Sequence, residues 1–176
     1  MSKIAIIGSH GVGKTTLIQS LKSLYPELNF IDEVARELQL KIGKSTKDMD
    51  DQEKSKFQLE AMQAQIDQEL KFEGYISDHC AISYLPYSTQ LPIYNELRLQ
   101  IQQQYLPILK QLKIIYIPIE FGLENDGLRF VTNEYQQYID ETLIDLLHKY
   151  NLKYTTVSGT VEQRLQQIAK LIDQYA

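Results

Sequence analysis

A glycine-rich segment near the N-terminus constrains the fold of this chain more than any other feature. Residues 8–15 read GSHGVGKT and fit the pattern G-x-x-x-x-G-K-[ST] without deviation. We call them the phosphate loop. The apolar stretch Lys3–Ile7 before the loop predicts a buried strand, and the apolar stripe of residues 15–25 after it predicts a helix. Strand, loop and helix therefore follow one another in the order that anion binding by such a loop requires.

The residues of the phosphate loop suit a polyphosphate. Its glycines let successive backbone N–H groups turn inward as an anion-binding nest, and the following helix adds the positive end of its dipole. Lys14 supplies a positive charge for the β- and γ-phosphates, and the Thr15 hydroxyl is a ligand for Mg²⁺. We predict that the loop binds a nucleoside triphosphate. The residues expected at the nucleotide are Gly8, Gly11, Val12, Gly13, Lys14, Thr15 and Thr16.

Strand and helix patterns alternate along the rest of the chain. Further strands are predicted over residues 28–32, 75–78, 113–119 and 152–157. Helices are predicted over residues 33–43, 52–72, 95–112 and 132–150, the third of them interrupted near Pro107. The last helix begins with the capping pattern of Thr160 and Gln163. This alternation predicts an α/β fold with a parallel sheet covered on both faces.

Length and composition limit the remaining possibilities. A chain of 176 residues, 43% hydrophobic and 23% charged, is expected to form one domain over residues 1–176. Its net charge of −5 disfavours non-specific nucleic-acid binding. The single cysteine, Cys80, cannot form an internal disulfide and fits a reducing cytoplasm. The N-terminal run IAII is too short for a signal peptide or a membrane span, and no candidate for either follows in the sequence. We expect a cytoplasmic protein; the sequence carries no signal for an oligomeric state.

Polar residues follow the predicted strands, where open α/β sheets bind their ligands. Asp32, Glu33 and Arg36 follow the second strand, Asp78 and His79 the third, and Gly159 and Thr160 the fifth. The guanine-recognition segment Asn-Lys-x-Asp of GTP-specific switches is absent after the fourth strand, where the sequence reads FGLENDGLRF.

Five segments together carry a resemblance to a known family: GSHGVGKTTL, DEVAREL, YISD, NDGLRF and VSGT. The chain resembles the small P-loop kinases, which are nucleoside and nucleotide kinases. It is most similar to the AAA-like ATPase family that includes the nicotinamide-riboside kinase domain. The resemblance spans residues 4 to 160. It implies a P-loop NTPase three-layer sandwich with a five-stranded parallel sheet, Mg·ATP as donor, and a small acceptor phosphorylated under a lid at residues 121–132.

The resemblance also suggests roles for individual residues. Asp78 is expected to hold Mg²⁺ through water or to orient the acceptor. Glu33 is expected to accept a proton from an acceptor hydroxyl or to bind a sugar hydroxyl, with Asp32 as its competitor and Asp78 as a third candidate for the base. Arg36 is a further candidate at the acceptor. The relatives often place Arg after the strand-end Asp, whereas this chain has His79, which removes one expected phosphate contact.

The remaining candidates belong to the predicted lid, the wall of the acceptor pocket and the adenine side of the site. Arg129 is expected to reach the γ-phosphate from the lid, with Gly127 as a hinge. Gln58, beside Phe57, is expected in the wall of the acceptor pocket, and Gly159 is expected to lie against adenine. His10 stands at a variable loop position, where packing or exposure to solvent is the simpler interpretation. Tyr84 and Tyr87 are interpreted first as structural, half-buried tyrosines.

The sequence therefore predicts an ATP- and Mg²⁺-dependent kinase of a nucleoside or nucleotide-like acceptor. The scarcity of arginine, with four in the chain, tilts the prediction toward a nucleoside, because bound phosphates favour bidentate arginine contacts. The alternative is a nucleotide-binding regulatory or switch NTPase with slow hydrolysis and a protein or lipid partner.

Overall fold

A five-stranded parallel sheet forms the centre of the molecule. The computed structural model describes residues 2–121 and 132–175. The strands are β1 (Lys3–Ile7), β2 (Phe30–Ile31), β3 (Tyr75–Asp78), β4 (Lys113–Tyr116) and β5 (Tyr154–Thr156). They pair in the order β2-β3-β1-β4-β5, and every pairing is parallel. The predicted α/β fold with a five-stranded parallel sheet is confirmed.

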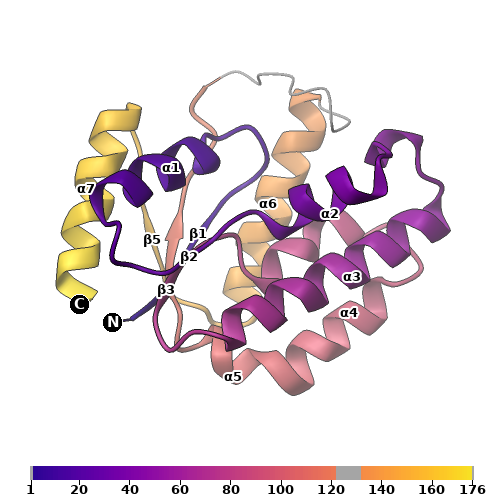
Figure 1. The fold of residues 1–176 in the computed structure, drawn as a ribbon. Helices are drawn as coiled ribbons and strands as arrows, with labels where there is room; N and C mark the ends of the chain where they lie inside the picture. The colour runs from indigo at the N-terminus through magenta and orange to yellow at the C-terminus, as the bar shows by residue number, and fades with distance from the viewer. Residues whose placement is uncertain (1, 122–131, 176) are drawn as a thin grey trace.

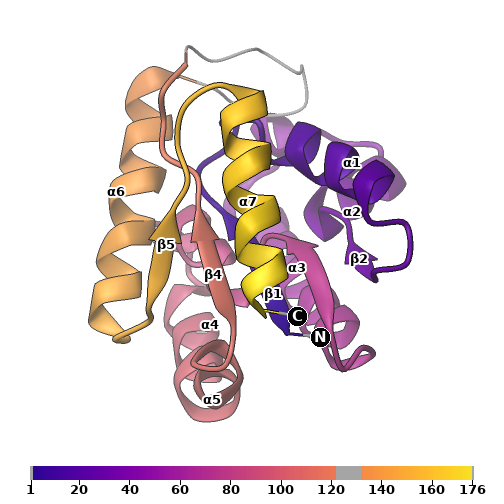
Figure 2. The ribbon, with the colours of Figure 1, turned by 90° about the vertical axis from the view of Figure 1, so that its left-hand side faces the viewer.

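Helices cover both faces of this sheet, as Figures 1 and 2 show. On one face lie α1 (Lys14–Leu24) and α7 (Val161–Tyr175), and the other α-helices lie on the opposite face. Those are α2 (Val34–Ile42), α3 (Asp51–Leu70), α4 (Tyr94–Gln100), α5 (Leu106–Leu109) and α6 (Asn133–Lys149). Short 3₁₀ turns are η1 (Thr46–Asp48), η2 (Ala81–Tyr84) and η3 (Pro86–Ser88). The predicted capping box is present, because Gln163 Oε1 accepts from the Thr160 N–H and the Thr160 hydroxyl accepts from the Gln163 N–H.

A hydrophobic core lies between the sheet and the helices on each of its faces, and β1 contributes to both cores. Ile4 and Ile6 point to the core shared with α1 and α7, whereas Ala5 and Ile7 point to the larger core under α3, α4 and α6. The alternation follows from the two-residue period of a strand. A strand buried on both faces reads as a continuous apolar run, which is why the sequence pattern located β1 correctly.

The interruption predicted near Pro107 is present in the structure. The helix expected over residues 95–112 is divided into α4, a π-helical segment η4 (Ile101–Tyr105), and α5. Pro107 has no N–H and its ring collides with the carbonyl four residues earlier, so the wider turn precedes the proline and relieves both problems.

The sheet order brings the ends of β1 and β3 together. Ile6 pairs with Asp78, so the phosphate loop leaves β1 next to the last residue of β3. At the opposite end of the sheet the two ends of the described chain meet, where the Ser2 hydroxyl donates to the Tyr175 carbonyl at 2.6 Å (Figure 1). Within residues 2–121 and 132–175, no helix has both the length and the apolar character needed to cross a bilayer.

Candidate active site

The phosphate loop takes a conformation that favours glycine at several positions. Gly8, Gly11 and Gly13 have φ of +154°, +76° and +89°. At Gly8 there is a second reason, because a Cβ would lie closer than 3.0 Å to the Ile117 carbonyl oxygen after β4. The first glycine of the motif thus allows the loop to pass against the neighbouring strand, while the later ones allow its turn.

The two polar side chains after Gly13 connect the loop to the rest of the site. Lys14 is 5% exposed, and its Nζ donates to the Ser9 carbonyl at 2.7 Å. The Thr15 hydroxyl donates to Asp78 Oδ2 at 3.0 Å. A hydroxyl and a carboxylate are the hard oxygen donors that Mg²⁺ prefers together with substrate phosphates, so Thr15 and Asp78 fit the ion predicted for them.

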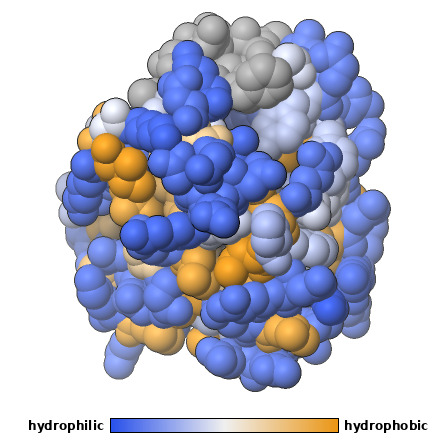
Figure 3. Space-filling view, turned by 90° about the vertical axis from the view of Figure 1, so that its right-hand side faces the viewer, coloured by the Kyte–Doolittle hydropathy of each residue, from blue (hydrophilic) through white to orange (hydrophobic). Residues whose placement is uncertain are grey.

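A cavity of about 510 Å³ lies beside the loop. Figure 3 shows the side of the molecule toward which α2 and α3 extend, a largely hydrophilic face with hydrophobic side chains gathered near its middle. The lining comes from the phosphate loop, α2 and its N-cap, η1, α3, the η2–η3 region and α6. It includes His10, Glu33, Gln39, Phe57, Gln58, His79, Tyr84, Tyr87, Tyr135 and Tyr138.

Acidic and imidazole groups meet where this cavity approaches Asp78. His79 Nε2 lies 3.9 Å from Glu33 Oε1 and 4.0 Å from Asp78 Oδ1, and all three side chains are almost fully buried. His79 has φ of +79°, a strained value for a residue other than glycine, and such strain concentrates at functional sites. Asp32 differs from Glu33: it is paired with Lys22 at 2.6 Å and does not line the cavity.

An aromatic wall, consisting of His10, Tyr87, Tyr135 and Tyr138, bounds the cavity on the side of α6. The His10 ring lies 6.1 Å from the Tyr87 ring and 5.8 Å from the Tyr135 ring, measured between centroids. Tyr135 stacks on Tyr138 at 6.5 Å. The sequence left open whether Tyr84 and Tyr87 line the pocket, and it could not show the ring contacts of His10, because those contacts join segments far apart in the chain. All of these side chains line the cavity.

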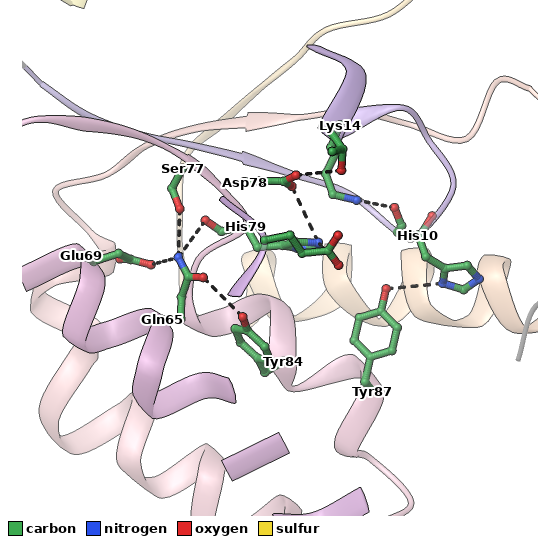
Figure 4. A network of polar contacts seen from close by, with 12 residues as sticks. His10, Lys14, Gln65, Glu69, Ser77, Asp78, His79, Tyr84 and Tyr87 are labelled. Atoms are coloured by element: carbon green, nitrogen blue, oxygen red, sulfur yellow. Dashed lines mark hydrogen bonds and ion pairs between the residues drawn. The ribbon is translucent and has the colours of Figure 1, made fainter. Parts of the chain in front are cut away.

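Behind Tyr84 lies a buried polar network that the sequence did not reveal (Figure 4). The Tyr84 hydroxyl donates to Gln65 Oε1 at 3.3 Å, and Gln65 Nε2 donates to Glu69 and to the Ser77 hydroxyl at 2.9 Å. The Tyr75 and Tyr105 hydroxyls also donate to Glu69. Burial raises the pKa of Glu69, and burial raises the pKa of Tyr84 as well, with the nearby Glu33 adding to the rise. The network fixes Tyr84 against the end of β3.

The other predicted site residues fall at different distances from the cavity. Gln58 lines it, is 9% exposed, and has an Oε1 for which residues 2–121 and 132–175 provide no hydrogen-bond partner. Arg36 is half-buried on α2 and is not part of the lining. Gly159 lies in the β5–α7 turn with φ of +98°. Arg129 and most of the predicted lid lie outside the described residues, so its role stays a prediction.

Comparisons with known proteins agree with this fold. The sequence matches the AAA domain family over residues 3–164. The structure of the NadR protein in complex with NAD and AMP-PNP has a TM-score of 0.76 at 18% identity, covering 99% of this chain and 49% of that chain. NadR in complex with NR gives 0.75 at 21%, covering 99% and 51%. Deoxyadenosine kinase from M. mycoides, with products dCMP and a flexible dCDP bound, gives 0.71 at 16%, covering 99% and 100%. No curated protein matches the sequence.

The fold and the phosphate loop define a P-loop protein with a parallel α/β sheet. Within that class, the chain belongs to the AAA domain family, whose match covers most of its length. The resemblance predicted from the sequence is thereby confirmed. At 16–21% identity the solved structures share the fold, and this chain spans about half the length of the NadR chains.

Proposed function

We propose that this protein is a kinase that transfers the γ-phosphate of Mg·ATP to a nucleoside or nucleotide-like small molecule. The observation that carries the proposal is the position of Asp78. Its carboxylate contacts Thr15 of the phosphate loop on one side and lies 4.0 Å from His79 of the acceptor cavity on the other. A nucleotide held by the loop and a molecule held by the cavity would therefore meet at this residue.

Each group in the site has a task in such a transfer. The nest and the N-terminus of α1 bind the β- and γ-phosphates, and Lys14 exchanges its bond to Ser9 for one to phosphate. Thr15 and Asp78 would hold Mg²⁺, which when bound neutralises charge on the phosphates. Glu33, buried in the cavity wall, orients the acceptor hydroxyl and receives its proton. Arg129 is proposed to reach the γ-phosphate from the segment outside the described residues.

The lining of the cavity favours a nucleoside over a nucleotide as acceptor. Among the described residues no arginine lines it, and its charged groups other than Glu33 come from α3 and η1 at residues 47, 51 and 54. The aromatic wall and Phe57 suit a flat ring. The buried Oε1 of Gln58 has no protein donor among the described residues, so an N–H or O–H on a bound ring would satisfy it.

A panel assay tests this proposal. ADP formation from Mg·ATP is measured with each of a set of nucleosides and nucleoside monophosphates, and with no acceptor. We expect ADP formation that depends on one nucleoside, a phosphorylated product detected by mass, and no turnover in Lys14→Ala. The same slow rate with and without every acceptor would refute the kinase and support a regulatory NTPase, which needs no acceptor cavity.

A further inference from the structure

Side chains from two distant helices hold the phosphate loop from behind. Gln136 Nε2, on α6, donates to the His10 carbonyl oxygen at 2.7 Å. Arg164 Nη1, in the first turns of α7, donates to the Val12 carbonyl oxygen at 2.6 Å. Gln136 is 2% exposed and Arg164 is 1% exposed. Both contacts join residues more than 120 positions apart, so they depend on the completed fold.

Each of these bonds fixes the direction of the next N–H group in the loop. A trans peptide unit is planar, and its C=O and N–H bonds point in opposite directions. The described chain contains no cis peptide. A carbonyl bonded on the outer side of the loop therefore turns the following N–H toward the inner side. By this geometry Gln136 directs the N–H of Gly11, and Arg164 directs the N–H of Gly13.

The Arg164 guanidinium is itself anchored by the segments around it. Its Nη2 donates to Glu120 Oε2 at 2.6 Å, and the same oxygen accepts the Gly159 N–H at 2.7 Å. The Phe121 ring lies over the guanidinium, with its centroid 5.2 Å from the Arg164 Cζ. A planar guanidinium that binds in two directions is fixed in orientation, so the donor to Val12 is held in place.

We propose that Gln136 and Arg164 are positioning residues that preorganise the phosphate loop for a polyphosphate, an inference that rests on the proposed donor site. A loop with freely rotating peptides loses conformational entropy when it binds, and it also presents carbonyl oxygens that repel phosphate. A loop whose carbonyls are bonded from behind avoids both costs. The two residues act through the backbone and do not touch the nucleotide.

Binding of magnesium tripolyphosphate and of Mg·ATP to the full chain tests this inference by calorimetry. Gln136→Met and Arg164→Met remove the donors while keeping a long side chain. Each is expected to weaken both ligands about tenfold and by the same factor, the loss of one well-placed hydrogen bond. Gln137→Met is the matched control on the same helix, since the Gln137 side chain donates to Glu141 at the surface, and it should leave both affinities unchanged. Amide exchange of residues 9–14 in the ligand-free protein should be faster in the two variants alone.

Arg164→Lys keeps the charge and one donor, so its loss should be smaller than that of Arg164→Met. If Arg164→Met does not fold because its buried site is disrupted, Arg164→Lys provides a second variant in which binding can be measured. Unchanged tripolyphosphate affinity in folded Gln136→Met and Arg164 variants would overturn the inference while leaving the donor site intact. Weaker ATP binding with normal tripolyphosphate binding would also overturn the inference, because the variant would then affect contacts to the adenosine part of ATP and not the phosphate loop. A wild-type protein that binds neither ligand would instead refute the proposed donor site, and this inference with it.

Discussion

Glycine at position 8 has two reasons, a positive φ and a close backbone neighbour, and Gly8→Ala tests both. A Cβ at residue 8 meets both a positive φ and the Ile117 carbonyl oxygen, which is backbone and cannot swing aside. A φ of +154° is sparsely populated by residues with a Cβ and costs them about 1–3 kcal/mol. The overlap with backbone adds about 1–3 kcal/mol, as in other overpacked sites. The free energy of unfolding should therefore fall by about 2–6 kcal/mol.

Two other glycines serve as matched controls. Gly43 has φ of +70° and nothing within 4 Å of its Cβ position, so Gly43→Ala measures the conformational cost alone, about 1–2 kcal/mol. At Gly159 the close atom is the end of the flexible Gln163 side chain, so Gly159→Ala should fall between the two. Urea denaturation followed by far-UV circular dichroism gives all three values. If Gly8→Ala and Gly43→Ala lower the free energy of unfolding equally, the Ile117 carbonyl oxygen is not a reason for glycine at position 8.

The remaining predictions concern transfer and pH. Asp78→Asn should bind Mg·ATP nearly as the wild type does but lower the rate of transfer about 100-fold or more in single-turnover measurements; equal rates would remove Asp78 from the mechanism. Arg129→Ala should lower kcat about 10³-fold, with a much smaller effect on ATP affinity in a binding titration. The pKa of Glu120 is lowered from 4.5, first by the Arg164 hydrogen bond and then by the Gly159 N–H. A lowered carboxyl pKa stabilises the folded state above 4.5, so the stability advantage of wild type over Glu120→Gln should shrink as the pH falls below that value. An advantage independent of pH would contradict this assignment.

Local sequence patterns predicted where several of the candidate site residues lie. The phosphate loop, β3 and Asp78 could be found because their signal lies within short segments of the chain. The same is true of Glu33 and Gln58, which the structure places in the cavity lining. The fold was needed to see that Glu33 lines the cavity while Asp32 is paired with Lys22.

Contacts between distant segments could not be predicted in this way. Arg164 was merely one of four arginines in the sequence, and its bond to Val12 spans 152 positions. Glu69 reads as an ordinary polar residue of a helix until Tyr75 and Tyr105 are placed beside it. The importance of such polar groups can be recognised only in the folded structure, where they are buried and each needs a hydrogen-bond partner.

The hydrogen bond between Ser2 and Tyr175 has a practical consequence for engineering this domain. Because the two ends of the described chain adjoin at the end of the sheet opposite Asp78, a fluorescent protein attached to either one should leave the cavity unobstructed. A short peptide bridge between them should likewise permit circular permutation, with new termini opened at the exposed turn around Gly43.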